Sequence, residues 1–116
     1  MIIPTIRYAD ARGAIDFLER AFGLECRPGG TPAHSELTLD RGVVMVGTRK
    51  NDRFETGRAV LYGLVDDPDA LHDRAKAAGA TIIQELTDQD YGSREFAAED
   101  PEGNVWSFGT YDPFAA

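Results

Sequence analysis

Cysteine, histidine and long apolar runs are all scarce in this chain. Its single cysteine, Cys26, excludes an intrachain disulfide, and a cysteine-based metal site would need ligands of other types. No apolar run approaches the roughly 18 residues that a membrane span needs. The amino-terminal run MIIPTIRYAD lacks a basic stretch followed by an apolar core, so no export signal is expected. These absences predict a cytoplasmic protein that has no membrane partner.

Basic residues are also in deficit, with 12 against 20 acidic residues and a formal net charge of −8. Such a field repels the backbone of nucleic acids and the surface of anionic membranes, so neither is expected as a partner. A cationic small molecule would be attracted, although acidity that serves only solubility explains the same charge. The length of 116 residues suits one domain with one core.

The hydrophobic pattern predicts the order βαβββ twice. A β-branched run at 2–8 precedes a stretch with apolar residues at helical spacing, which ends at Gly23, and three short strand-like runs follow. The same order begins again near residue 59. The helix-ending glycines Gly23 and Gly79 are 56 residues apart (79 − 23), and the turn glycines Gly42 and Gly103 are 61 apart (103 − 42).

These offsets predict one α+β domain over 1–116 with two similar modules. The first module covers 1–50, a polar linker covers 51–57 and the second module covers 58–112. In each module the helix covers one face of a sheet and leaves the other face bare. Two bare concave faces can close on each other into a half-barrel cavity, with the helices outside.

The run YGSREFAAEDPEGNVWSFG, at 91–109, is the most distinctive stretch. Its Pro-Glu-Gly-Asn turn joins two strand-like segments, and Gly103 is expected to have a positive φ. This run resembles the last hairpin of the vicinal-oxygen-chelate superfamily, which includes glyoxalases, bleomycin resistance proteins and extradiol dioxygenases. Within that group, an aromatic-Gly-x-Arg-Glu-Phe run followed by Asp-Pro-x-Gly-Asn is most similar to the bleomycin-resistance branch. The resemblance implies a homodimer in which each cavity is built from halves of both chains.

The resemblance also implies where a metal ion would bind. Enzymes of the superfamily hold one divalent ion with His, Gln or Glu side chains from the first and last strands of each module. Counting from the aspartates that open the helices and the hairpin places these positions at Ile3, Val46, Val60 and Ser107. Three aliphatic side chains and one hydroxyl do not make a metal site. The sequence therefore predicts no metal, no other cofactor and no catalytic residue of the metal-dependent type.

Strand alternation from these four positions predicts which side chains line the cavity, and it includes Val44, Val46 and Thr48. The candidate ligand-binding residues are Arg7, His34, Glu36, Phe54, Tyr62, Tyr91 and Ser107. Aliphatic and aromatic surface with a few polar groups is typical of small-molecule sites.

Each polar candidate has alternative roles. His34 and Glu36 are two residues apart, which suits a general acid–base pair, a polar anchor for an amine or simply an exposed rim. Arg7 can neutralise a substrate carboxylate or pair with Glu36, and the internal pair is slightly favoured. For Tyr91, in the family-like YGSREF run, the resemblance implies a place at the pocket or the dimer edge.

Aromatic and histidine side chains outside this set are given structural roles. The parity of Trp106 and Phe108 places them under a helix, in the core. His72, among charged residues on the second predicted helix, is interpreted as solvated.

The leading hypothesis is a metal-free protein that binds and sequesters a small planar or cationic molecule, such as an antibiotic. The alternative is an enzyme that uses the same cavity, a glyoxalase-like lyase or isomerase working through His34 and Glu36, or a dioxygenase-type enzyme. A third interpretation is a protein-interaction module, which a cavity filled by the chain's own side chains would favour.

Overall fold

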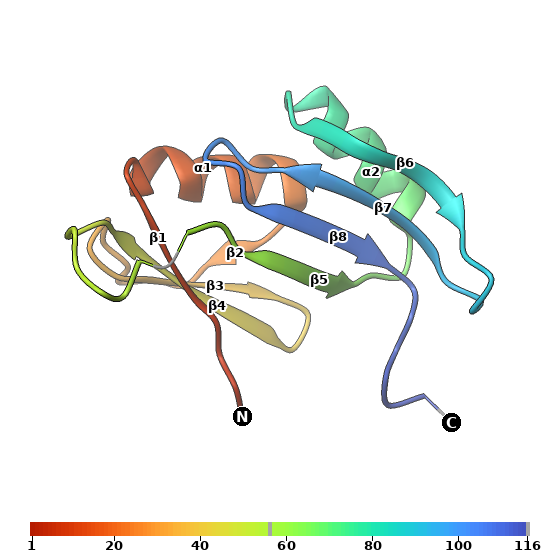
Figure 1. Cartoon of the computed structure of the whole chain (residues 1–116), viewed down its shortest axis with the longest axis horizontal. Helices are drawn as coiled ribbons and strands as arrows, with labels where there is room; N and C mark the ends of the chain where they lie inside the picture. The colour runs from red at the N-terminus through yellow and green to blue at the C-terminus, as the bar shows by residue number, and fades with distance from the viewer. Residues whose placement is uncertain (56, 116) are drawn as a thin grey trace.

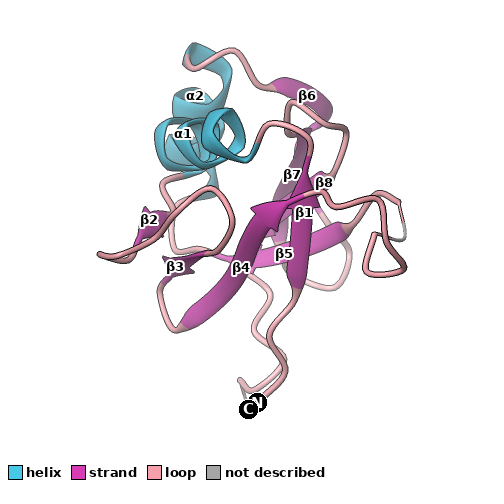
Figure 2. Ribbon diagram, turned by 90° about the vertical axis from the view of Figure 1, so that its left-hand side faces the viewer, coloured by secondary structure: helices cyan, strands magenta, loops and turns pink. Residues whose placement is uncertain are grey.

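The computed structural model describes residues 1–55 and 57–115. Thr56, within the predicted linker 51–57, lies outside these residues. Each half of the chain forms a four-stranded sheet, and the two helices lie on the same side of the sheets (Figures 1 and 2). Both termini extend to the other side. None of the described helices is long and apolar enough to cross a membrane.

The first module consists of β1 (Thr5–Tyr8), α1 (Ala11–Phe22), β2 (Glu25–Cys26), β3 (Ser35–Leu39) and β4 (Gly42–Thr48). The second consists of β5 (Val60–Leu64), α2 (Pro68–Ala77), β6 (Thr81–Asp88), β7 (Arg94–Glu99) and β8 (Val105–Gly109). The strand orders are β1-β4-β3-β2 and β5-β8-β7-β6. The first and last strands of each module pair in parallel and the other neighbours are antiparallel. The predicted α+β fold with two βαβββ modules is confirmed.

Both helices begin at a capping aspartate. The Asp10 carboxylate accepts a hydrogen bond from the Gly13 amide at 3.0 Å, and Asp67 accepts one from the Ala70 amide at the same distance. These bonds satisfy amide groups that have no partner within the helix. Gly23, with φ of 74°, ends α1 in the left-handed conformation that the sequence predicts.

The helix α1 joins the two modules through its last turn. The ring of Phe22 lies 5.6 Å from Trp106 and 5.0 Å from Phe108 between centroids, so a helix of the first module packs on the second sheet. Trp106 and Phe108 are both buried, which confirms their predicted place in the core. Fully buried side chains from both modules form one hydrophobic cluster, which includes Tyr8, Leu18, Phe22, Leu37, Val46, Phe96 and Phe108.

The predicted orientation of β4 is wrong for Val44, Val46 and Thr48. Val44 pairs with Leu37 and Thr48 pairs with Tyr8 on the face under the helices, and Val44 and Val46 lie in the core. Matching Gly42 with Gly103 set this strand one residue out of register. The Met45 side chain therefore lies on the face of the sheet away from the helices. This face of each sheet is called the open face.

His72 is buried rather than solvated, which corrects a further prediction. Its Nε2 lies 2.8 Å from Oε1 of Glu85, and its ring meets the ring of Phe96 edge-on at 5.3 Å between centroids. The helix α2 places this histidine against the sheet although its sequence neighbours are charged.

The carboxylate of Asp100 ties the two modules together at the hairpin turn. It is buried and accepts hydrogen bonds from the Tyr8 hydroxyl, from Nε1 of Trp106 at 3.1 Å and from Nδ2 of Asn104 at 3.0 Å. It also accepts from the backbone amides of Glu102 and Asn104. Burial, followed by the bond to Asp100, raises the pKa of Tyr8 well above its ordinary value.

Glu102 of the same turn also contacts the first module. The Glu102 carboxylate accepts hydrogen bonds from the amides of Ala9 and Asp10, at 2.7 and 2.8 Å, just where β1 leads into α1. Gly103 has φ of 86°, the positive value that the turn sequence predicts.

Replacing Asp100 with Asn is expected to destabilise the protein by about 3 kcal/mol, because an amide NH₂ would replace an oxygen that accepts several buried donors. The matched control is Asp16→Asn, since the Asp16 side chain is exposed and pairs only with Arg20 on the same helix. That change should cost less than about 1 kcal/mol. Chemical denaturation of both variants measures the difference, and equal stability of the two would contradict the role of Asp100.

Candidate functional site

The seven predicted ligand-binding residues fall in three places in the single chain. Arg7 and Phe54 lie beside a cavity of about 390 Å³ between β1 and the loop after β4. His34 and Glu36 line a second cavity of about 190 Å³. The other three, Tyr62, Tyr91 and Ser107, belong to the second module, so one chain does not bring the whole set together.

Arg7 is held by the polar loop rather than by Glu36. Its guanidinium donates to Asp52 at 2.8 Å and to Glu55 at 3.2 Å, and it lies 5.3 Å from the centre of the Phe54 ring. The predicted pair with Glu36 is therefore wrong. The amide of Phe54, followed by Arg7, lowers the pKa of the Asp52 carboxyl below its ordinary value. These contacts hold residues 52–55 close to β1.

The cavity beside Arg7 is also lined by two arginines that sequence reasoning missed. Arg49 and Arg58 flank it, together with Thr5 and Ala59. Arg49 lies 4.0 Å from Glu102, and Arg58 lies beside Gly103 of the hairpin turn, so both are close to the junction of the modules.

His34 and Glu36 come together, but Glu36 already has a cationic partner. His34 lies in an exposed turn before β3, where its backbone bridges Thr31. The Glu36 carboxylate accepts from Arg27 at 3.1 Å. Because this carboxylate is already paired with a cation, the arrangement gives little support to general-base chemistry by Glu36.

The open face of the second sheet exposes unusually large apolar side chains. Tyr62 of β5 pairs in register with Ser107 of β8, and Val60 pairs with Val105. Val60 is 77% exposed and Tyr62 is 43% exposed. The Tyr62 hydroxyl accepts from the Tyr111 amide at 2.8 Å and donates to the Tyr111 carbonyl at 3.2 Å, which fixes its ring beside the segment after β8.

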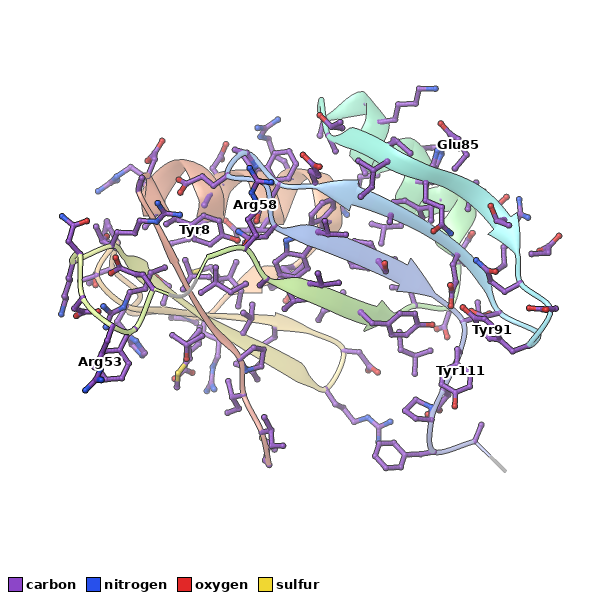
Figure 3. All side chains as sticks on the ribbon, viewed as in Figure 1. Tyr8, Arg53, Arg58, Glu85, Tyr91 and Tyr111 are labelled. Carbon is purple, nitrogen blue, oxygen red and sulfur yellow. The ribbon has the colours of Figure 1, made fainter. Side chains whose placement is uncertain are left out.

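Tyr91 and Tyr111 complete a tyrosine cluster at the end of this sheet (Figure 3). Their rings meet edge-on, 5.9 Å apart between centroids. The Tyr91 hydroxyl donates to Oε1 of Glu95 at 2.7 Å, and Glu95 is buried. This bond to a carboxylate favours the neutral phenol and raises the pKa of Tyr91 to about 12.

Sequence reasoning missed two members of this cluster, Glu95 and Tyr111. Glu95 stands within the motif that gave the family resemblance, and the alternation of β7 places it on the same face as Ala97, the partner of Ser107. That alternation was the signal that could have found it. Nothing in the sequence shows that Tyr111, beyond the last strand, turns back to Tyr62.

The family's metal positions do not fit a divalent ion. With the register of β4 corrected, the side chains at these places are Ile3, Met45, Val60 and Ser107. In the described part of the chain, no three His, Cys, Asp or Glu side chains come close enough to hold a metal. No metal-dependent step is assigned to these residues.

The net charge belongs entirely to the second half of the sequence. Residues 1–57 contain eight basic and eight acidic residues, whereas residues 58–116 contain four basic and twelve acidic ones. The −8 of the whole chain is therefore concentrated in the half that carries the tyrosine cluster.

Curated relatives are similar to this chain in sequence, and solved structures are similar to it in fold. Uncharacterized proteins of Mycobacterium bovis and Mycobacterium tuberculosis are 34% identical over 121 residues, which cover 91% of this chain and 80% and 71% of theirs. TioX from Micromonospora sp. ML1 has a TM-score of 0.82 at 29% identity, with 100% of this chain and 99% of that one covered.

A glyoxalase/bleomycin resistance protein/dioxygenase family enzyme from Burkholderia phytofirmans PsJN has a TM-score of 0.75 at 20% identity, over 92% of this chain and 94% of its own, and shows the same fold. The model of the Glyoxalase/Bleomycin resistance protein/Dioxygenase superfamily matches residues 3–108. This match spans both βαβββ modules, and the chain therefore belongs to the glyoxalase/bleomycin resistance protein/dioxygenase superfamily.

Proposed function

We propose that this protein binds a small cationic or aromatic molecule, such as an antibiotic, and sequesters it without chemical change. The observation that carries the proposal is the tyrosine cluster on the open face of the second sheet. Tyr62, Tyr91 and Tyr111 are 43%, 58% and 49% exposed and contact one another in sequence, Tyr62 with the Tyr111 backbone and Tyr111 with the Tyr91 ring. The Tyr91 hydroxyl in turn donates to the buried Glu95. Aromatic walls with a few fixed polar groups are the usual composition of a small-molecule site.

The side chains at the positions of the family's metal ligands support ligand binding over catalysis. The family's metal positions carry apolar side chains and one hydroxyl, which offer nothing to polarise a carbonyl group. The acid–base alternative has weaker support because the carboxylate of Glu36 pairs with Arg27.

We further propose that two chains pair so that the first sheet of one faces the second sheet of the other. Such pairing would cover Val60 and Tyr62, which are large apolar side chains left exposed in the single chain. It would also bring Arg7 and Phe54 of one protomer toward the tyrosine cluster of its partner. The three separate groups of predicted residues would then contribute to a shared cavity.

Ligand binding should raise the melting temperature, since a ligand that binds only the folded state stabilises it. The panel contains bleomycin and planar aromatic cations such as acridine dyes. For the compound that binds, Tyr62→Ala should weaken affinity by at least about 10-fold, because an aromatic contact is lost. The control Tyr62→Phe keeps the ring and should change affinity by less than about 3-fold. Equal loss in both variants would show that the ring of Tyr62 is not a ligand contact.

Dimerisation is tested by light scattering, with an expected mass of twice 12.7 kDa. Val60→Asp should produce a monomer with nearly unchanged stability, because Val60 makes little contact within its own chain. Ile83→Asp is the matched control, since Ile83 is exposed on β6, at the opposite edge of the same sheet. A dimer that survives Val60→Asp would rule out this pairing.

A further inference from the structure

We propose that the ligand carries an organic ammonium group whose N–H binds the carboxylate of Glu95, inside the tyrosine cluster. The inference rests on the proposed function and names the chemical group that the same site selects. Glu95 is the positioned acceptor, and the rings of Tyr62, Tyr91 and Tyr111 form the walls around the cation.

Glu95 is a buried carboxylate with only part of its hydrogen-bonding capacity used. The residue is 8% exposed. Among residues 1–55 and 57–115, the Tyr91 hydroxyl is its only hydrogen-bond donor, and it binds Oε1. No Lys, Arg or His of the described chain lies within 4.0 Å of the carboxylate. Oε2 has no hydrogen-bond partner among these residues, and none of their unpartnered side-chain N or O atoms is buried, so Oε2 reaches the surface. It is therefore an acceptor that a ligand cation can reach and bind.

Arg94, which precedes Glu95 in the sequence, does not neutralise the Glu95 carboxylate. Arg94 points to the other side of β7, where its guanidinium donates to Asp69 at 2.7 Å and to Asp88 at 3.1 Å. Alternation along the strand thus separates the charge of Arg94 from that of Glu95.

The backbone around Glu95 is shaped to receive its side chain. Gly109 of β8 pairs with Glu95, and a Cβ at this glycine would overlap Cγ of Glu95 and lie 2.8 Å from the Tyr62 hydroxyl. It would also lie 2.9 Å from Oγ of Ser93, which accepts the amides of Thr110 and Tyr111. The bare glycine therefore leaves the room in which the carboxylate and the Tyr62 ring meet.

The tyrosine rings suit a cation because they are held in place but half open. Tyr62 is fixed by two hydrogen bonds to the backbone of Tyr111, and Tyr91 by its bond to Glu95. Aromatic faces attract a cation within about 6 Å of the ring centre, and the attraction grows when water is excluded. An alkylammonium ion with a flat apolar substituent satisfies both the carboxylate and the rings.

The surrounding charge acts in the same direction. All of the excess negative charge lies in residues 58–116, so a cation approaching this sheet is attracted and an anion is repelled. The field is general, whereas the contact to Glu95 is local, and the two contributions can be separated by mutation.

The experiment compares three probes that share a phenylpropyl chain: 3-phenylpropylammonium, 3-phenylpropanol and 3-phenylpropanoate. Calorimetric titration of the wild-type protein should give the ammonium ion an affinity at least about 10-fold above the alcohol, since a charge-assisted bond is stronger than a neutral one. Glu95→Gln should remove that preference and leave the alcohol within about 3-fold of its wild-type affinity. Glu99→Gln is the matched control, because Glu99 lies on the same strand and face and carries the same charge.

The outcomes of this titration test the ammonium assignment separately from the proposed function. Binding of all three probes with equal affinity to the wild type would keep the proposed function and overturn the ammonium assignment, even if Glu95→Gln does not fold. Equal losses in Glu95→Gln and Glu99→Gln would also overturn it, because the general field would then account for the preference. If none of these probes and no compound of the wider panel binds, the proposed function fails as well.

Discussion

The buried carboxylate of Asp100 is the interaction on which the relation between the two modules depends. Its hydrogen bonds, from five donor groups of the described residues, close the turn between β7 and β8 and reach across to the Tyr8 hydroxyl at the end of β1. A buried anion without a cationic partner is tolerated only when its acceptor positions are filled, as they are here. Phe22, at the other end of α1, also packs on the second sheet. Contacts near both ends of α1 therefore fix the first module against the second.

In this arrangement the two faces of the sheets differ in how much of their apolar surface is buried. On the helix side, side chains from both modules form one buried cluster. On the open face of the second sheet, Val60 and Tyr62 are 77% and 43% exposed, and Tyr91, in the turn before β7, is 58% exposed. Much of this apolar surface is left uncovered, which is the condition that a ligand or a second protomer would relieve.

Much of the fold could be predicted because its signals are local. The aspartate caps, the glycine that ends α1 and the Pro-Glu-Gly-Asn turn each depend on a few neighbouring residues, and all three lie where the sequence places them. The alternation of Trp106 and Phe108 was sufficient to assign them to the core. The register of β4 was not local, since it depends on pairing with β3, and one residue of error reversed the faces of Val44 and Val46.

The site was harder to predict because side-chain partners come from distant segments. Arg7 meets Asp52 and Glu55, some 45 and 48 residues away, rather than Glu36. His72 is buried because α2 turns it toward Phe96, although its sequence neighbours are charged. Glu95 was overlooked because its burial depends on other strands, where Gly109 pairs with it and the Tyr62 hydroxyl lies beside that glycine. In each case the residue types were visible, but the tertiary contacts that give them a role were not.

The absence of metal ligands and the presence of Glu95 together reverse the electrostatics of a family site. A divalent ion in this fold would present positive charge to the oxygen atoms of a substrate. In this chain those positions carry Ile3, Met45, Val60 and Ser107, while a buried carboxylate lies two strands from β5 on the same open face. The charged group on this open face is therefore an anion, where a metal would have been a cation. Under the proposed function, the scaffold keeps its aromatic surface but selects cations, and it does so through binding in the ground state.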